Sequence, residues 1–347
     1  MNGKNMLIIG GAGFIGINAA RHFYDRGYAI TIFDNFSRKG TKVNVEQFLA
    51  EHRDGAVVIE GDIVSSPERL EPLIESVDVV LHLAAQVAVT TSITNPRNDF
   101  EQNALGTFNV LEVIRKSTRR PILLFASTNK VYGGLENLTV HESEDRFRFD
   151  NEAAQSFGIS ESQQLDFHSP YGCSKGIADQ YVIDYARIYG LKTVVFRQSC
   201  IYGKHQFGIE DQGWIAWFTI AAMLGKPLTL FGTGKQVRDA LYVEDLCRLY
   251  EQAIEHIDEV SGQAFNTGGG PENTLSLIVL LRILKKYGYD VDPAHADPRA
   301  GDQPIFVADI RKAKRLLNWE PAMGVKEGID AMHGWLVEHT DTLNKFF

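Results

Sequence analysis

The chain of 347 residues is poor in cysteine, with only Cys173, Cys200 and Cys247. Their spacing matches neither a metal-binding motif nor a disulfide framework, so we expect no metal and a reducing compartment, the cytoplasm. No hydrophobic run reaches the roughly 20 residues of a membrane span. The apolar start at Met6–Ile17 is interrupted by glycines, unlike a signal peptide. We therefore expect no membrane partner.

An excess of basic residues is also missing, because 35 Lys and Arg stand against 44 Asp and Glu and the net charge is −9. A general nucleic-acid binder normally shows a basic face, so we expect no nucleic-acid partner. An anionic substrate would have to be met by a few well-placed basic residues. Hydrophobic residues at 44% and charged residues at 23% are ordinary for a globular enzyme of one large domain or two.

A glycine-rich loop follows the first expected strand, which covers residues 6–9. The loop contains Gly10-x-x-Gly13-x-x-Gly16. Glycines at these places permit a tight turn, close approach of a pyrophosphate, and close packing of helix on strand. The helix expected over residues 15–26 would direct its N-terminal amides toward phosphates. By itself, such a loop could be only a turn.

An acidic residue ends the second expected strand, over residues 29–33. It is Asp34, eighteen residues after Gly16. An acid at this place can bond both ribose hydroxyls and repels a 2′-phosphate, which favours NAD over NADP. Arg38 complicates the choice, because a nearby arginine could accept that phosphate. Strand, loop, helix and acid together predict a dinucleotide site.

Strands and helices continue to alternate along the chain. Further strands are expected over residues 57–63, 77–85, 191–196 and from residue 122 onward, with a long helix over 99–116. This alternation predicts an α/β fold with a doubly wound parallel Rossmann sheet, whose ligands lie beyond the carboxyl ends of the strands.

The sequence also suggests a division into two domains. We assign residues 1–195 to an NAD-binding domain that carries the catalytic residues, and 196–347 mainly to a smaller α/β substrate domain. Segments such as 237–262 are free to return to the first domain. The polar stretch 134–168 shows no clear periodicity and is long for a connection, so it is either an active-site flap or disordered.

A tyrosine and a lysine stand four residues apart after Pro170, which suits the first turn of a helix. Tyr171 and Lys175 should therefore share one helix face, where the ammonium would favour the phenolate and make the tyrosine a base for an alcohol. Thr128 would lie at the ligand edge of the sheet. Alone, the Tyr-x-x-x-Lys spacing is more typical of a solvated helix face, and Thr128 is more typical of a strand-end turn.

In their order along the chain, the motifs resemble an extended short-chain dehydrogenase/reductase acting on nucleotide sugars. The likeness covers nearly the whole chain and rests on the glycine loop, Asp34, Thr128 four residues before Tyr132, Tyr171-x-x-x-Lys175, and Arg238-Asp239. Segments 127–133, 167–175 and 196–203 resemble the subgroup of 2-epimerases that act on CDP-linked 3,6-dideoxyhexoses of bacterial O-antigen, a part of lipopolysaccharide.

The resemblance implies a mechanism with tightly bound NAD. Tyr171 would take the proton of the C2 hydroxyl while C2 gives hydride to the nicotinamide, and the 2-keto sugar would turn before the hydride returns. Lys175 would lower the tyrosine pKa and hold the nicotinamide ribose, and Thr128 would donate a hydrogen bond to the reacting oxygen. The implied cofactor residues are Gly10, Gly13, Phe14, Ile15, Gly16, Asp34, Asn35, Ser37, Arg38, Asp62, Ile63, Leu83, Ala84, Ala85, Tyr171 and Lys175.

The resemblance also implies a site for a CDP-linked deoxysugar. Its residues would be Asn129, Lys130, Ser199, Cys200, Gln206, Arg238 and Arg299. Arg238 and Arg299 are the candidates for the diphosphate, through charge-assisted bidentate bonds, with a surface ion pair as the alternative for each. Lys130 is either a substrate contact or a solvated strand end.

Two departures separate the chain from its relatives. The 4,6-dehydratases carry an Asp-Glu pair where Asn129 and Lys130 stand, and the 4-epimerases carry an asparagine at the position of Cys200. A UDP-hexose 4-epimerase is the alternative enzyme, and a non-catalytic NAD-binding regulator is the alternative of another class. The family also implies a homodimer or homotetramer, with helices 99–116 and 171–189 packed across a two-fold axis.

Overall fold

The computed structural model describes residues 4–52, 55–299 and 302–347. Its centre is a seven-stranded sheet in the order β12-β8-β5-β4-β1-β2-β3, in which every neighbouring pair is parallel. The strands are β1 (Asn5–Ile9), β2 (Ala29–Asp34), β3 (Ala56–Glu60), β4 (Val79–His82), β5 (Ile122–Thr128), β8 (Thr193–Gln198) and β12 (Gln263–Thr267). The predicted doubly wound parallel fold is confirmed, although β3 ends at Glu60, before Asp62.

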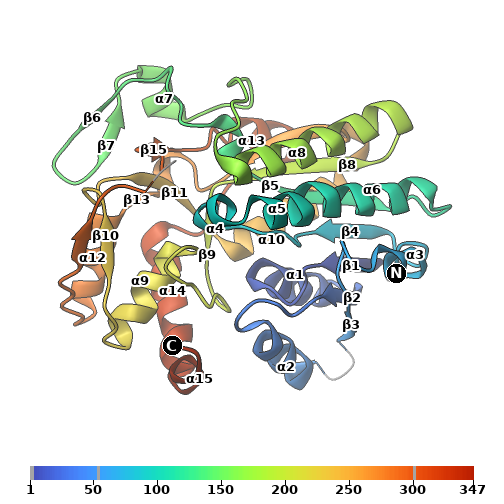
Figure 1. Ribbon diagram of the computed structural model, residues 1–347, viewed down its shortest axis with the longest axis horizontal. Coiled ribbons are helices and arrows are strands. Elements are labelled where there is room, and N and C mark those ends of the chain that lie inside the picture. The colour runs from blue at the N-terminus through green and yellow to red at the C-terminus, as the bar shows by residue number, and fades with distance from the viewer. Residues whose placement is uncertain (1–3, 53–54, 300–301) are drawn as a thin grey trace.

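Helices cover both faces of this sheet (Figure 1). On one face lie α1 (Phe14–Tyr24), α2 (Thr41–Glu51) and α10 (Val243–Glu255), and on the other lie α6 (Gly106–Lys116) and α8 (Ser169–Tyr189). Side chains of β1 alternate between the two cores, with Met6 and Ile8 in one and Leu7 and Ile9 in the other. Both faces are therefore buried, which explains why the strands are apolar runs rather than alternating patterns.

The long helix predicted over residues 99–116 is present but interrupted. It begins as α5 (Pro96–Phe100), widens into a π-helical turn at Glu101–Leu105, and continues as α6. Single π-turns inside helices are rare and are frequently found at functional sites. This turn places the buried Asn103 against α8, where its Nδ2 lies 3.0 Å from Ser174 Oγ.

A second sheet lies beside the carboxyl ends of the first. At its centre β11 (Val237–Tyr242) pairs parallel with β9 (Cys200–Tyr202) and β15 (Ile305–Phe306) and antiparallel with β13 (Thr274–Ser276). Around it lie β10 (Thr229–Phe231), β14 (Ala294–Ala296), α9 (Trp214–Met223), α12 (Leu277–Lys286), α14 (Val325–Glu338) and α15 (Thr340–Phe346). The chain returns through α10, which packs on α1, and β12 to the central sheet. The domain boundary at residue 195 stays a prediction.

The segment 134–168 is ordered, so the alternative of disorder is wrong. It forms the hairpin β6 (Val140–Glu142) and β7 (Phe147–Phe149), followed by α7 (Glu152–Phe157). Phe149 and Ile159 join a small core with Phe306 and Val307. These apolar residues are too scattered to show a period. No described residue of the segment lines either cavity of the candidate site in this conformation, so the alternative of an active-site flap stays a prediction.

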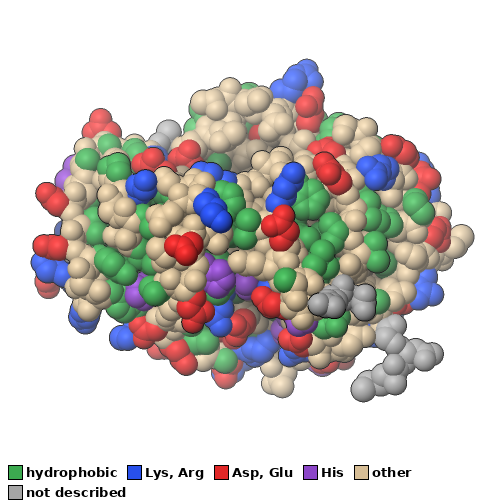
Figure 2. All heavy atoms as spheres, turned by 90° about the horizontal axis from the view of Figure 1, so that it is seen from below, with side chains coloured by type: hydrophobic (Ala, Val, Ile, Leu, Met, Phe, Trp, Pro, Cys, Tyr) green, Lys and Arg blue, Asp and Glu red, His purple; other side chains and the backbone are tan. Residues whose placement is uncertain are grey.

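The remaining elements are short and connect the larger ones. They are 3₁₀ turns at Pro67–Leu70, Asn129–Tyr132 and Pro271–Asn273, and the helices α3 (Glu71–Ile74), α4 (Val89–Thr94), α11 (Ile257–Val260) and α13 (Arg311–Leu317). Basic and acidic side chains are interspersed over the face shown in Figure 2. Among the residues placed in the structure, no helix combines the length and apolar character needed to cross a bilayer.

Candidate active site

A cavity of about 520 Å³ opens where β1, β2, β4 and β5 end. All the residues that the resemblance assigned to the cofactor, from Gly10 to Lys175, line this cavity. It lies at the point where β1 is flanked by β2 on one side and β4 on the other, the switch point of a doubly wound sheet. The cavity is therefore where this fold class binds its ligands.

The glycine loop suits a dinucleotide. A Cβ at Gly16 would lie 2.6 Å from the Gly10 carbonyl oxygen, and Gly10 itself has φ +80° and lies against the backbone of Ala84. No side chain caps α1, whose first turn, including Phe14 and Ile15, faces the cavity. Uncapped amides at a helix N-terminus are an anion site, so the loop fits the pyrophosphate of NAD.

The carboxylate of Asp34 is held at the end of β2 by the backbone. Its Oδ2 accepts a hydrogen bond from Ala12 N at 3.0 Å, and its Oδ1 accepts one from Phe36 N at 2.8 Å. Burial raises the pKa of this carboxyl, and the two amides oppose that effect. Arg38 donates to the side chain of Gln212, and its charge acts on both Asp34 and Tyr171. Its guanidinium is thus already bonded to a neutral side chain and lies within electrostatic reach of both Asp34 and Tyr171.

The structure brings Tyr171 and Thr128 together. Tyr171 lies in the first turn of α8, is 8% exposed and lines the cofactor cavity. Thr128 ends β5, does not line the cavity, and lies close enough to the phenol of Tyr171 for its hydroxyl to lower the pKa of that phenol. A hydroxyl within hydrogen-bonding reach of a phenol beside a dinucleotide cavity is suited to proton transfer with an alcohol.

The predicted action of Lys175 on Tyr171 stays a prediction, because other groups set the pKa of the tyrosine in this conformation. Burial raises the pKa of Tyr171 to about 12, and the groups that lower it are Thr128 and Arg38, with Asp99 raising it. Lys175 donates from Nζ to the carbonyl oxygen of Ala126 at 2.6 Å, and burial lowers its own pKa to about 7. The lysine is directed at strand backbone rather than at the phenol, which the four-residue spacing could not reveal.

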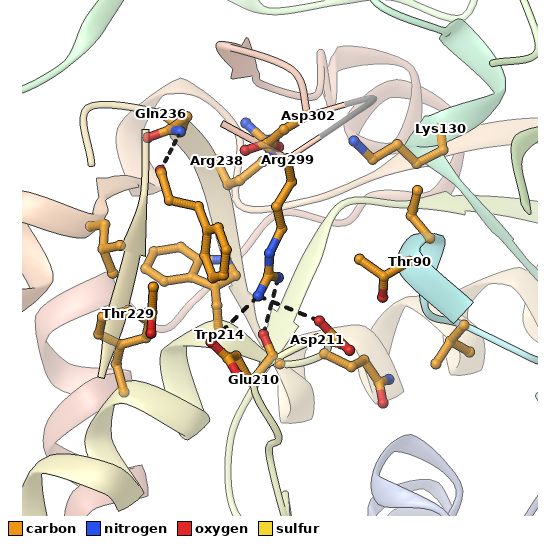
Figure 3. A pocket seen from close by; sticks show the side chains of 17 residues that line it. Thr90, Lys130, Glu210, Asp211, Trp214, Thr229, Gln236, Arg238, Arg299 and Asp302 are labelled. Carbon is orange, nitrogen blue, oxygen red and sulfur yellow. Dashed lines mark hydrogen bonds and ion pairs between the residues drawn. The ribbon is translucent and has the colours of Figure 1, made fainter. Parts of the chain in front are cut away.

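A second cavity, of about 290 Å³, lies between the central sheet and the second sheet. Lys130, Arg238 and Arg299 line it (Figure 3). Arg238 Nη2 lies 2.6 Å from Asp302 Oδ1, and Arg299 Nη2 lies 3.4 Å from Asp211 Oδ1. Burial, and then the charge of Arg238, lower the pKa of Lys130 to about 8. Glu210, Asp211 and Asp302 also line the cavity, so its basic groups are matched by as many carboxylates.

Four residues assigned to the substrate do not line either cavity. The side chain of Asn129 is 3.5 Å from Gln303 Oε1, that of Ser199 bonds the carboxylate of Asp239, and the amide of Gln206 reaches Ile201 O at 3.4 Å. Burial raises the pKa of the Cys200 thiol to about 12. In this conformation these side chains stabilise the surroundings of the cavity rather than forming its wall.

Sequence reasoning missed the residues that separate the two cavities. Val87 and Gln212 line both of them. Gln212 closes a turn with Ile209, in which each backbone amide donates to the other's carbonyl oxygen at 3.0 and 2.9 Å. Gln86 and Ser127 also line the cofactor cavity. Their only sequence signal is their place just after β4 and at the end of β5.

Comparison with known proteins decides the family. The family model described as "NAD dependent epimerase/dehydratase family" matches residues 6–268. The chain belongs to this family. The predicted epimerase enzyme class and NAD as cofactor are thereby confirmed.

The similarity of this epimerase to individual relatives extends over nearly the whole chain. It is 43% identical to CDP-paratose 2-epimerase of Salmonella typhi, over 95% of this chain and 98% of that one. UDP-glucose 4-epimerase of Thermotoga maritima, solved with UDP-glucose, has 30% identity and a TM-score of 0.81, covering 97% and 99% of the two chains. UDP-glucose 4-epimerase of Thermus thermophilus, solved with NAD, has 28% identity and a TM-score of 0.78, covering 96% and 99%.

Proposed function

We propose that the protein inverts C2 of a CDP-linked 3,6-dideoxyhexose, converting CDP-paratose to CDP-tyvelose, for bacterial O-antigen. The observation that carries this proposal is the 43% identity to a CDP-paratose 2-epimerase over nearly the whole of both chains. Bound NAD would supply the capacity to accept a hydride from the carbinol carbon and to return it. The cavity lined by Lys130, Arg238 and Arg299 would hold the sugar nucleotide.

In this proposal Tyr171 acts as the phenolate, which takes the proton of the C2 hydroxyl at its phenolic oxygen and later returns it. Its pKa, raised to about 12 by burial in this conformation, therefore has to fall when the site is filled. Thr128, whose hydroxyl acts on that phenol, polarises the substrate oxygen as it changes between alcohol and ketone. Lys175, fixed by Ala126 O, holds the nicotinamide ribose. The sugar must turn over between the two half-reactions, so the chain has to hold the nucleotide firmly and the sugar loosely.

The diphosphate is assigned to the two arginines. Both are already paired with carboxylates, Arg238 with Asp302 and Arg299 with Glu210 and Asp211, so the substrate would take over part of these interactions. Dehydration is disfavoured, because Asn129 and Lys130 stand where the dehydratases carry an acidic pair. Without these two carboxylates the chain lacks their acid and base for removal of water.

The deciding experiment follows the hydrogen on C2. The purified holoenzyme is given CDP-paratose deuterated at C2, and the product is examined by NMR. Because hydride leaves and returns within one binding event, we expect CDP-tyvelose that retains the deuterium, and no deuterium at C2 after turnover in heavy water. Label lost to solvent, or inversion at another carbon, would contradict the proposal.

A UDP-hexose 4-epimerase is the second candidate, favoured by the likeness to the Thermotoga maritima enzyme. The same NMR assay with UDP-glucose distinguishes it, since that activity inverts C4 and leaves C2 untouched. A non-catalytic NAD-binding regulator would turn over neither substrate. The presence of Thr128 together with Tyr171 and Lys175 speaks against a regulator, because binding NAD for sensing requires no groups for proton transfer.

We also propose a homodimer through the outer faces of α5, the π-turn, α6 and α8, which lie side by side (Figure 1). Large apolar side chains are exposed there, at Phe100, Leu105, Phe108, Ile177 and Tyr181. A contiguous apolar patch on a folded protein marks an interaction surface. Sedimentation should give a dimer, or a homotetramer built from it, and Phe108→Asp should give monomers. A monomeric wild-type protein would contradict this.

The cytoplasm is proposed as the compartment of the enzyme. Cys173, Cys200 and Cys247 are all unpaired in the structure. Free thiols persist where glutathione and thioredoxin keep them reduced. Fractionation of the producing cells would test this assignment.

A further inference from the structure

A buried carboxylate that no step of the proposed mechanism uses lies behind the tyrosine and the lysine. Asp99, on α5, is fully buried against α8. Its Oδ2 accepts a hydrogen bond from Ser174 Oγ at 2.6 Å, and its Oδ1 accepts from Asn103 Nδ2 and Gln86 Nε2, each at 3.1 Å. Within the described residues, no basic nitrogen lies within 4.0 Å of it. Burial of a charge is costly, and here three neutral donors offset that cost.

The donors connect Asp99 to both parts of the catalytic site. Ser174 lies between Tyr171 and Lys175 on α8, and its hydroxyl also contacts the carbonyl oxygen of Tyr171 at 3.2 Å. Gln86 lines the cofactor cavity. A shift of the Asp99 carboxylate would therefore move the first turn of α8 and the cavity wall together.

Several charged groups face the tyrosine and the lysine from neighbouring elements. Asp179 on α8, Asp99 on α5 and His82 on β4 face Lys175, and Asp99, Thr128 on β5 and Arg38 face Tyr171. Arg197 on β8 compensates Asp179 through hydrogen bonds of 3.0 and 2.9 Å. Of the two carboxylates that face Lys175, Asp99 is the one held entirely by neutral donors.

We propose that Asp99 is a positioning residue, whose buried charge contributes to the protonation of Tyr171 and Lys175 while its hydrogen bonds fix the first turn of α8. The inference rests on the proposed role of Tyr171 as the base. A negative charge favours protonated lysine and disfavours phenolate, so its presence keeps both groups protonated to higher pH. Asp99 thus opposes the effect of burial on the pKa of Lys175 and adds to the effect of burial on the pKa of Tyr171.

The test compares three variants of the holoenzyme. Asp99→Asn removes the charge and keeps the shape, Asp99→Glu keeps the charge, and Ser174→Ala removes one hydrogen bond while keeping the charge. Two measurements are made: the pH dependence of kcat, and the ¹³C NMR titration of enzyme labelled at tyrosine Cζ. The Tyr171 resonance is assigned by its loss in Tyr171→Phe. The titration needs no turnover.

We expect Asp99→Asn to move the Tyr171 titration and both limbs of the pH profile to lower pH by roughly one unit, the scale of a neighbouring charge. Asp99→Glu should restore the wild-type positions, and Ser174→Ala should lower kcat without moving them. An Asp99→Asn titration that superposes on the wild type overturns the inference, because a purely structural role would leave these positions unchanged.

A further variant distinguishes a loss of folding from a change in the Tyr171 titration. If Asp99→Asn does not fold, Asp99→Ser, which leaves room for water, replaces it with the same expectation. Loss of the fold with every uncharged residue, and its recovery with glutamate, would overturn the inference, because the carboxylate would then serve stability. A shifted Tyr171 titration in a protein that turns over no sugar nucleotide would support the inference and contradict the proposed function.

Discussion

The two cavities of this epimerase differ in how they are built. The cofactor cavity is formed largely where neighbouring strands of one sheet end, and every residue assigned to it from sequence lines it. The second cavity, which we propose as the substrate cavity, draws on short segments from Val87 to Asp302, and of seven assigned residues only Lys130, Arg238 and Arg299 line it. Sequence motifs predict site residues well where the backbone of one element fixes their positions. They predict them poorly where segments distant in the sequence must converge.

We expect the largest effect from a change at Tyr171, the proposed base, which lines the cofactor cavity. Tyr171→Phe removes only the phenolic hydroxyl, so we expect turnover to fall by at least about three orders of magnitude, the upper range for general base catalysis. NAD content and affinity for the sugar nucleotide should change little, because the ring remains in the wall. Single-turnover rates and bound NAD are measured together. A variant that keeps a tenth of the wild-type rate would remove Tyr171 from the mechanism.

Replacing Asp34 should weaken the binding of NAD without changing the binding of the sugar nucleotide. Asp34→Ala should weaken NAD binding by about 1.5–3 kcal/mol, the scale for hydrogen bonds to a charged group. Asp34→Asn is the matched control for shape, since its amide oxygen can still accept from Ala12 N or Phe36 N. Calorimetric titration of apoenzyme with NAD measures the loss. Equal affinity for NAD and NADP in the wild type would contradict the reading of Asp34 over Arg38.

There is a physical reason why the residues of the cofactor cavity could be predicted from the sequence. Asp34 follows directly from its strand, and Gly10 and Gly16 are required by contacts within their own loop. Tyr171 follows from a helix whose start is marked by Pro170. In each case the position depends on a few neighbouring residues, and the parallel sheet then brings the strand ends to one edge.

There is also a physical reason why other side-chain contacts could not be predicted from the sequence. The direction of the Lys175 ammonium depends on the carbonyl of Ala126, which lies 49 residues earlier in the chain. Ser199 turns to Asp239 through the pairing of β9 with β11. The π-turn that brings Asn103 to Ser174 has no sequence signature. These choices are made by tertiary contacts, which a linear pattern does not contain.

Replacing either arginine of the proposed substrate cavity should weaken the binding of the sugar nucleotide without changing the affinity for NAD. Arg238→Ala and Arg299→Ala should each weaken binding of the sugar nucleotide by about 1–2 kcal/mol, because charge-assisted bonds to the diphosphate replace existing ion pairs rather than water. Arg282→Ala, which removes an ion pair with Asp145 away from both cavities, is the control and should leave both affinities unchanged. Loss of NAD affinity with normal substrate binding would move these arginines out of the site.

The smallest expected effect is a pH dependence of substrate affinity that the cofactor cavity should not share. Burial and Arg238 lower the pKa of Lys130 to about 8, so its positive charge is present below that pH and is lost as the pH rises through it. A bound diphosphate favours the charged form and raises this pKa in the complex. The dissociation constant of the sugar nucleotide should therefore increase above pH 8 and level off at the higher pKa.

The size of this increase measures the interaction of Lys130 with the substrate. A difference of one pKa unit between free and bound enzyme corresponds to a tenfold change in affinity, so we expect a rise of several-fold to about tenfold between pH 7 and 9.5. Lys130→Arg should abolish the rise, because arginine stays charged over this range. Lys130→Met should bind weakly at every pH. A wild-type dissociation constant that stays flat, while NAD binding is normal, would show that the ammonium of Lys130 does not meet the substrate.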